Sequence, residues 1–297
     1  MNKLITIFTP TYNRSNLLHK CYESLKRQTV KNFEWLVIDD GSTDDTKSLI
    51  NNWIQNESEF TIKYVYKENG GLHSGYNEAI KHLETELSIC IDSDDYLTDN
   101  CVELIQDKWK KNGTSEFAGI LGLDILESGE ILGGSINGIN TINLFDLTVG
   151  NLKLKQADRK PVIRTDLYKN VAPMPTFIGE KNFNPHYMHL QISKEYDFLV
   201  LNEPLCIVEY QVDGMSQNMW WQYYNSPNSF LETRKLYLTY KKSSLKFKAK
   251  TIIHLIASGI LSKKSPLKEC QYKVACIFLY PLGLALVILI KNKVKKR

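Results

Sequence analysis

The chain has 297 residues, of which 43% are hydrophobic and 24% charged, as in an ordinary globular protein of one or two domains. It contains no evident repeat or low-complexity tract, and its six cysteines form no CxxC pair, which favours buried, reduced thiols over disulfides or zinc ligands. The N-terminus carries a single Lys and a short apolar run, so we expect neither a secretory signal nor a transit peptide. The catalytic part should therefore stay in the cytoplasm.

Strands and helices alternate through the first half of the chain. Short β-branched and apolar runs predict strands at residues 4–9, 33–38, 62–66 and 87–91. Segments with helical spacing follow them at about residues 17–25, 44–53, 73–83 and 101–109. Strands separated by helices imply parallel pairing, so we expect an α/β fold with a doubly wound, mostly parallel sheet of Rossmann-like type.

The fourth predicted strand ends in the acidic sequence CIDSDDY. Asp92, Asp94 and Asp95 follow the apolar run directly. Ligands of open α/β sheets bind at the carboxyl ends of the strands, and two carboxylates one residue apart suit a hard divalent cation that carries phosphate oxygens. Mg²⁺ or Mn²⁺ on a nucleoside diphosphate is one interpretation of Asp92 and Asp94, and capping of the next helix is the other.

The other three predicted strands also end in residues suited to a nucleotide. The first leads into TPTYNR, whose Tyr12 could stack on a base, and the second into IDDGSTDDT, whose carboxylates could accept hydrogen bonds from a base or a ribose. The third leads into KENGGLHSGYN, where Gly70 and Gly71 permit close approach of a ligand to the backbone. All four segments fall at one edge of the predicted sheet, which capping turns alone do not explain.

The segments TPTYNR, VIDDGSTDDT, NGGLHSGYN and CIDSDD, in this order, resemble the nucleotide-sugar domain of family 2 glycosyltransferases. The resemblance covers residues 3 to about 123 strongly and extends more weakly to about 220. It implies a GT-A fold, a nucleoside-diphosphate sugar donor that is usually UDP-linked, a divalent metal, and inversion at the anomeric carbon.

The resemblance also assigns roles to particular residues. It implies that Asp92 and Asp94 are the metal ligands, Mn²⁺ or Mg²⁺ being the expected cofactor. The residues expected to bind the donor are Thr11, Tyr12, Asn13, Arg14, Asp39, Asp40, Gly71, Asn77, Asp92 and Ser93.

Other nucleotide enzymes fit the sequence less well. A GxxxxGK[ST] loop is absent, which disfavours P-loop phosphoryl transfer. Dehalogenase-type phosphatases usually place their acidic pair on the first strand, and here it follows the fourth. A sugar-phosphate nucleotidyltransferase would need a glycine-rich N-terminal loop that this sequence lacks.

The middle of the chain should supply the acceptor side and the catalytic base. We expect strands near residues 117–123, 130–132, 162–163, 196–200 and 206–210. An inverting transferase needs a base for the acceptor hydroxyl. Many relatives carry a Glu-Asp pair there, whereas this chain has Glu180 followed by Lys181, and His186 at a predicted helix start. Glu180 and His186 are both candidates for the base, and both also fit structural roles.

The region after residue 210 offers two further features. The loop Val212–Asn218 contains Asp213, Gly214 and Ser216, and loops here often close over the donor in this family. The aromatic residues Trp220, Trp221, Tyr223 and Tyr224 could form an acceptor or membrane platform, or simply belong to a core.

The C-terminal third combines basic and apolar residues. Residues 234–264 predict a basic amphipathic helix, which suits an anionic membrane surface better than nucleic acid because its apolar positions are aliphatic. Residues 274–290 are then uncharged, and Pro281 interrupts them. This length is the lower limit for a span, so a spanning segment, interfacial insertion and a buried helix remain alternatives. We expect a GT-A glycosyltransferase domain at residues 1–225, with a nucleotide-sugar-binding half at 1–123 and an acceptor-side half at 124–225. A basic amphipathic and hydrophobic helical region that associates with the membrane should follow at 226–297.

The sequence as a whole predicts a membrane-associated glycosyltransferase. Its donor would be a nucleotide sugar, its acceptor a lipid-linked or other glycan of capsule, exopolysaccharide or lipopolysaccharide synthesis, and its location the cytoplasmic face of the plasma membrane. A non-catalytic, membrane-bound nucleotide-sugar sensor or scaffold is the alternative, because the Glu-Asp pair is absent.

Overall fold

The computed structural model describes residues 3–211 and 218–295, which group into two compact units. The first unit runs to Pro173 and adds Met188–Tyr210, and the second combines Met174–Tyr187 with the described residues from Gln211 onward. The predicted boundary between residues 225 and 226 falls inside the second unit. The two units are described separately below.

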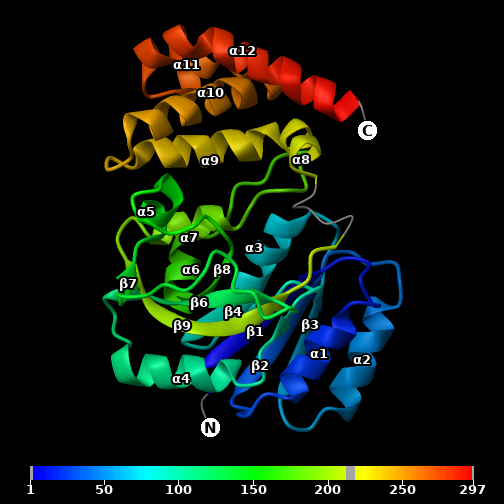
Figure 1. The fold of residues 1–297 in the computed structure, drawn as a ribbon. Helices are drawn as coiled ribbons and strands as arrows, with labels where there is room; N and C mark the ends of the chain where they lie inside the picture. The colour runs from blue at the N-terminus through cyan, green and yellow to red at the C-terminus, as the bar shows by residue number, and fades with distance from the viewer. Residues whose placement is uncertain (1–2, 212–217, 296–297) are drawn as a thin grey trace. The chain divides into compact units, whose positions relative to one another are not determined.

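The described part of the first unit contains a nine-stranded sheet (Figure 1). Its strands are β1 (Ile5–Thr11), β2 (Phe33–Asp39), β3 (Thr61–Tyr66), β4 (Leu87–Cys90), β5 (Tyr96–Leu97), β6 (Phe117–Leu126), β7 (Thr141–Ile142), β8 (Arg159–Arg164) and β9 (Asp197–Val208). The helices are α1 (Leu18–Lys26), α2 (Thr46–Asn56), α3 (Leu72–His82), α4 (Cys101–Asn112), α5 (Leu144–Val149), α6 (Thr165–Val171) and the greater part of α7 (His186–Ile192).

The sheet is mostly parallel in its N-terminal half, as predicted. The strand order is β3-β2-β1-β4-β8-β6-β9-β5, with β7 paired to β9. Strands β1 to β4 run parallel to one another, and β8 is antiparallel to both β4 and β6. The reversal at β8 separates the nucleotide-type half of the sheet from the strands that follow it.

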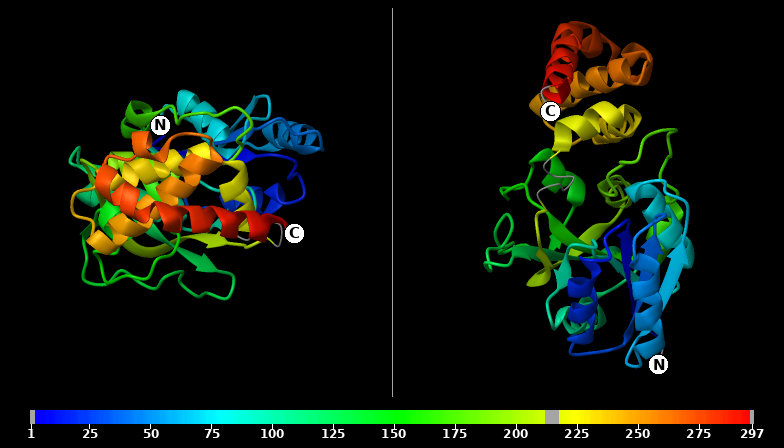
Figure 2. Two further views of the ribbon diagram at one scale, coloured as in Figure 1. Left: turned by 90° about the horizontal axis from the view of Figure 1, so that it is seen from above. Right: turned by 90° about the vertical axis from the view of Figure 1, so that its right-hand side faces the viewer.

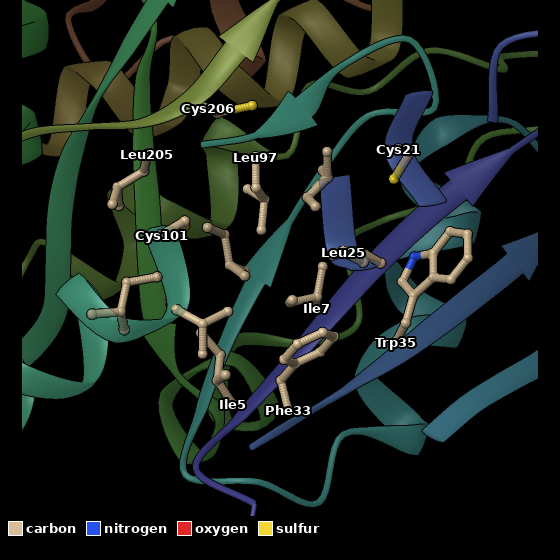
Figure 3. Close-up of a cluster of buried hydrophobic side chains, with 14 of the residues drawn as sticks. Ile5, Ile7, Cys21, Leu25, Phe33, Trp35, Leu97, Cys101, Leu205 and Cys206 are labelled. Atoms are coloured by element: carbon tan, nitrogen blue, oxygen red, sulfur yellow. The ribbon is translucent and has the colours of Figure 1, made fainter. Parts of the chain in front are cut away.

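Alternating side chains of β1 bury both faces of the sheet, which makes it doubly wound. Ile5 and Ile7 join the core that includes Leu25 of α1 and Trp35 of β2 (Figure 3). Phe8 points to the other face, where its ring meets Tyr76 of α3 edge-on with centroids 5.1 Å apart. A strand buried on both faces requires apolar residues at successive positions, and the run in β1 meets that requirement.

The strand after residue 196 differs from the prediction. The two strands expected at 196–200 and 206–210 are one long strand, β9. Its register against β6 shifts between the pairs Leu121↔Val200 and Leu123↔Pro204. The residues Asn202–Pro204 therefore form an irregularity within a strand rather than the turn that their composition indicates, because pairing with β6 resumes beyond them.

The second unit is helical in its described part beyond residue 217. It contains α8 (Met219–Asn225), α9 (Pro227–Thr239), α10 (Leu245–Leu261), α11 (Pro266–Glu269) and α12 (Lys273–Lys295). Helices α9, α10 and α12 lie side by side, as the two views of Figure 2 show. Their shared core contains Leu231, Leu238, Ile252, Leu255, Ile256 and Cys276.

Two predictions for the C-terminal region need correction. The region 234–264, expected to form a single basic helix, is divided between two helices, because α9 ends at Thr239 and α10 begins at Leu245. Ser244 caps the start of α10: its hydroxyl accepts a hydrogen bond from the Phe247 N–H at 3.2 Å. Pro281 does not interrupt α12, which continues on both sides of it. A proline removes one backbone hydrogen bond, and the packing of α12 on α10 offsets that loss.

We predict that Gly119→Ala destabilises the first unit severely. Gly119 lies in β6 with φ +143°, and an added Cβ would stand 2.0 Å from the Val162 carbonyl oxygen of β8. The collision should cost about 1–3 kcal/mol of unfolding free energy in addition to the strain of positive φ. Urea denaturation followed by circular dichroism measures the loss.

The matched control is Gly129→Ala. Gly129 has φ +83° and no atom within 4 Å of an added Cβ, so only the backbone penalty of about 1–2 kcal/mol applies. Equal losses in the two variants would contradict the close approach of β6 to β8.

Candidate active site

The parallel register of the sheet brings three strand ends to one edge. Thr11 of β1 pairs with Asp39 of β2, and the Asp40 N–H donates to the Thr11 carbonyl at 2.8 Å. On the other side of β1, the Ile91 N–H donates to the Phe8 carbonyl at 3.0 Å, so Asp92 leaves the sheet beside the same strand. The predicted donor residues of the first, second and fourth strands therefore begin their loops at neighbouring positions.

Asn13 joins the loops after β1 and β2, and Asp39 ties the loop after β2 to β3. Asp39 is fully buried, and its carboxylate accepts hydrogen bonds from the Tyr64 hydroxyl at 2.6 Å and the Ser42 N–H at 2.7 Å. Asn13 has φ +51°, accepts from the Thr43 N–H at 2.7 Å and donates its own N–H to the Ser42 hydroxyl at 2.8 Å. In this structure both predicted donor residues are therefore engaged in ordering the loops at this edge.

Asp40 organises the glycine-containing loop before α3. One carboxylate oxygen accepts from the Lys67 ammonium at 2.6 Å and the Gly70 N–H at 2.9 Å. The other accepts from the Gly71 N–H at 2.7 Å. Gly71 itself has φ +89° and stands directly before α3, a backbone conformation that favours glycine. Lys67, which the sequence reading missed, begins the loop after β3 at the same edge.

The loop after β4 contains the three aspartates Asp92, Asp94 and Asp95. Asp94 forms an ion pair with Arg14, with Oδ2 and Nη1 2.6 Å apart, so residues from the first and fourth strand ends meet here. Asp92 is exposed and Ser93 is buried, and the Asp95 N–H donates to the Asp92 carbonyl at 3.0 Å to close the turn. Both predicted metal ligands thus lie in a tight turn at the edge of the sheet.

Three further predicted donor residues differ in their exposure. Tyr12 is 47% exposed, so its ring is accessible to a base. Thr11 is buried, and its hydroxyl has no hydrogen-bond partner among the described residues. Buried hydroxyls are normally satisfied, so an unpaired one beside Asp39 is the kind of group that a ligand completes. Asn77 is half-buried on α3.

A buried lysine beneath the acidic turn was missed by the sequence reading. The Lys160 ammonium, on β8, lies 3.9 Å from the Asp95 carboxylate and 3.7 Å from that of Asp124 on β6. Burial raises the pKa of Asp95 to about 8 and that of Asp124 to about 6, and the lysine opposes both shifts. Burial also acts to lower the pKa of Lys160, but the carboxylates outweigh it and the pKa lies above its ordinary value. Lys160 thus compensates negative charge behind the turn.

The residues present fit a divalent cation that shares its coordination with phosphate. The part of the chain that the structure describes contains no group of three or more His, Cys, Asp or Glu residues placed to bind a metal. Asp92 and Asp94 would supply hard carboxylate oxygens, which suit Mg²⁺ and Mn²⁺, and both ions commonly complete their shell with water and substrate phosphates. A site of this kind needs the diphosphate to be complete.

The two candidates for the base belong to the second unit. Glu180 is buried, and each of its carboxylate oxygens accepts two hydrogen bonds from Asn228 and Ser229 at 2.7–2.9 Å. These donors stand in the first turn of α9, so Glu180 caps that helix. His186 begins α7, and its N–H donates to the Asn184 side chain at 2.8 Å.

The remaining acceptor-side candidates are of two kinds. Asp213, Gly214 and Ser216 lie outside the described residues. Of the aromatic cluster, Tyr223 is buried and donates to the His254 carbonyl at 2.7 Å, so it belongs to the core of the helical unit. Trp220, Trp221 and Tyr224 are exposed on α8.

We predict that Asp40→Asn loosens the glycine loop. Asparagine keeps the size of the side chain but loses the charge and one acceptor, which should cost about 1.5–3 kcal/mol of unfolding free energy. Hydrogen exchange should show faster exchange of the Gly70 and Gly71 amides. Asp45→Asn is the control, because Asp45 is exposed and its side chain makes no capping hydrogen bond. Unchanged exchange at both glycines would contradict the role of Asp40.

Comparisons with known proteins identify relatives of the chain. Residues 6–153 match the profile of Glycosyl transferase family 2. Glycosyltransferase GlyA of Streptococcus pneumoniae is 35% identical over 104 residues, and chondroitin synthase of Pasteurella multocida is 35% identical over 111 residues. These matches cover 35% and 37% of this chain but only 15% and 11% of the two relatives.

Solved structures resemble a larger part of the chain. S. aureus TarS 1-349 in complex with UDP-GlcNAc has a TM-score of 0.59 at 16% identity, covering 99% of this chain and 92% of that one. The mannosyltransferase PcManGT of Pyrobaculum calidifontis, in complex with GDP-Man and Mn²⁺, has a TM-score of 0.58 at 14% identity, covering 97% of this chain and 84% of that one. The likeness confirms the predicted GT-A fold. The match over residues 6–153 shows that the chain belongs to the family 2 glycosyltransferases.

Proposed function

We propose that the protein transfers a sugar, with inversion, from a UDP-linked donor to a lipid-linked glycan at the cytoplasmic face of the plasma membrane. The observation that carries the proposal is the ion pair of Arg14 with Asp94, which joins the loops after β1 and β4. At the same edge of the sheet, Asp39 and Asp40 order the loops after β2 and β3. Relatives named as polysaccharide synthases support a role in capsule, exopolysaccharide or lipopolysaccharide assembly.

Different residues of the first unit would bind different parts of the donor. Tyr12, exposed beside β1, would stack on the uracil, and the unpaired Thr11 hydroxyl would bind the nucleoside. Arg14 would move from Asp94 toward phosphate, since a guanidinium binds both carboxylates and phosphates through paired hydrogen bonds. Asp92 and Asp94 would hold the Mn²⁺ or Mg²⁺, which when bound neutralises negative charge on the departing diphosphate.

Lys160 would keep the acidic turn in place while donor and metal bind. The carboxyl groups of Asp92, Asp94 and Asp95 lie close together, and the buried cation behind Asp95 lowers the electrostatic cost of ionising them. The carboxylates that face the ligand therefore remain available for coordination. Lys160 acts on the turn and does not touch the donor in this account.

The base that deprotonates the acceptor hydroxyl is proposed to be Glu180 or His186. Glu180 would have to release at least one of its four hydrogen bonds with α9 before it accepted a proton. Histidine is the side chain that most often serves as a general base in enzymes. The hydrogen bonds that hold Glu180 to α9 therefore favour His186 as the base.

The metal assignment is tested by Asp94→Asn. We expect UDP release from the UDP-sugar, in the presence of Mn²⁺ and a membrane lipid extract, to fall at least about 100-fold, because a charge-stabilising ligand is lost. Asp99→Asn is the control, since Asp99 lies on the next loop, is exposed and pairs with Arg27. Mn²⁺ binding measured by electron paramagnetic resonance should weaken in Asp94→Asn only. Full activity in that variant would rule out the metal site.

The base assignment is tested by comparing Glu180→Gln with His186→Ala. We expect Glu180→Gln to lower the unfolding free energy by about 1.5–3 kcal/mol, because an amide cannot accept all four hydrogen bonds, and to retain most of kcat. His186→Ala should lower kcat without changing the affinity for UDP. The reverse pattern would assign the base to Glu180. Donor binding by the wild-type protein without release for any sugar or extract would favour the sensor instead.

A further inference from the structure

Helix α12 is apolar on all sides although only one side is packed. Residues 274–290 contain no charged residue, and the helix includes an 18-residue window of mean hydropathy 2.4 of which 22% is buried. A helix that is hydrophobic all round lies either in a protein core or in a membrane. Only one face of α12 is buried in the protein, so the environment of its other face has to be explained.

The packed face of α12 fits against α10 in the same unit. Cys276, Gly283, Val287 and Ile290 are buried and recur at helical spacing. An added Cβ at Gly283 would stand 2.4 Å from the Ile256 side chain, so the glycine lets the two helices approach closely. This face of α12 is an integral part of the helical unit.

The opposite face of α12 is exposed and aliphatic or aromatic. Phe278 is 78% exposed and Val274 68%. The exposed large apolar residues of the helix are Val274, Ile277, Phe278, Tyr280, Leu282, Leu284, Ile288 and Leu289. A contiguous patch of this kind marks an interaction surface, because soluble proteins rarely leave one in water.

The packing of α12 argues against a transmembrane orientation. Helix α10 lies alongside it and carries Lys246, Lys248 and Lys250. The Lys248 ammonium is 5.9 Å from the ring centroid of Tyr272, just before α12 begins. The stretch without Lys, Arg, Asp or Glu that begins in α10, residues 251–262, is about 18 Å long at 1.5 Å per residue, shorter than a hydrocarbon core of about 30 Å. If α12 crossed a bilayer with this packing intact, lysines at one end of that stretch, either Lys250 or Lys263, would enter the hydrocarbon, where charged side chains are costly.

The charges around α12 identify the partner as an anionic lipid surface. Lys273 stands at its first turn, and Lys291, Lys293 and Lys295 at its last. No acidic residue follows Glu269 in the sequence. A second copy of this face would bring like charges together, whereas anionic headgroups neutralise them. Exposed tyrosines such as Tyr272 and Tyr280 also suit the boundary between headgroups and acyl chains.

We propose that α12 lies in the plane of an anionic membrane, with its exposed face in the headgroup and acyl boundary and its packed face on α10. The protein is then monotopic, and both ends of α12 stay on the side of the helical unit. This inference rests on the membrane association proposed above but not on the transfer reaction, so it can be tested without any substrate.

The first test measures binding of the full chain to phosphatidylglycerol and phosphatidylcholine vesicles by sedimentation. We expect the wild-type protein to bind phosphatidylglycerol vesicles, and salt to weaken this binding. The variant Phe278→Asn/Leu282→Asn should bind at least about tenfold more weakly, because two apolar side chains that would enter the membrane are lost. Ile54→Asn, an exposed isoleucine on α2, is the control and should bind as the wild type does. Equal melting temperatures of the three proteins would show that folding is unaffected.

Three results would overturn the proposal. Binding that the double variant retains would exclude the exposed face of α12 as the docking surface. If the wild-type protein were a dimer and the double variant a monomer, and neither bound vesicles, the partner of this face would be a second copy of the chain. A C-terminal epitope tag protected from protease in inverted membrane vesicles, with the first unit still accessible, would show that α12 spans the bilayer. We expect the tag and the first unit to be digested together.

Discussion

The parallel pairing of β1 with both β2 and β4 is the constraint on which the rest of the candidate site depends. It places Thr11 opposite Asp39 and sends Asp92 out of the sheet beside the same strand. Because successive residues of a strand point to opposite faces, a shift of one residue in either pairing would exchange the side chains of the two buried faces and disrupt the packing of both. The buried residues of β1 therefore fix the register, and the register brings the loops together.

The loops at this edge are ordered mainly by their own carboxylates. Asp39 accepts hydrogen bonds from Ser42 in its own loop and from Tyr64 of β3. Asp40 accepts from the loop before α3, and Asp94 is paired with Arg14. Buried charges are tolerated only when they are paired or hydrogen-bonded, and each of these is. Lys160 extends the same principle behind the acidic turn, where Asp95 and Asp124 would otherwise be buried without a counter-charge.

The sequence predicted the parallel half of the fold well because its signals are local. Each of the first four strands is a short apolar run followed by polar residues, and the loops at their ends carry recognisable motifs. Short elements such as β5 and β7 have two residues each and leave no periodic signal. The continuous β9 was read as two strands because the pairing that carries it past Pro204 comes from β6, far away in the sequence.

The site was predicted as a set of residues but not as a set of contacts. The motifs identified Asp40 and Asn13, yet nothing local shows that they hold loops rather than point outward. Lys67 could have been found, since it follows a predicted strand at the same edge. Lys160 could not, because it comes from an antiparallel strand whose place beside β4 is a long-range property. Likewise, the hydrogen bonds of Glu180 depend on α9, which begins 47 residues later.

The most direct test of the account is a crystal structure of the protein with UDP and Mn²⁺. We predict that the uracil lies beside Tyr12, that the Thr11 hydroxyl gains a partner, and that Mn²⁺ lies between the diphosphate and the Asp94 carboxylate. Arg14 should then have left Asp94. A nucleotide bound away from the ends of β1 and β4, or a metal that does not touch Asp92 or Asp94, would contradict the account.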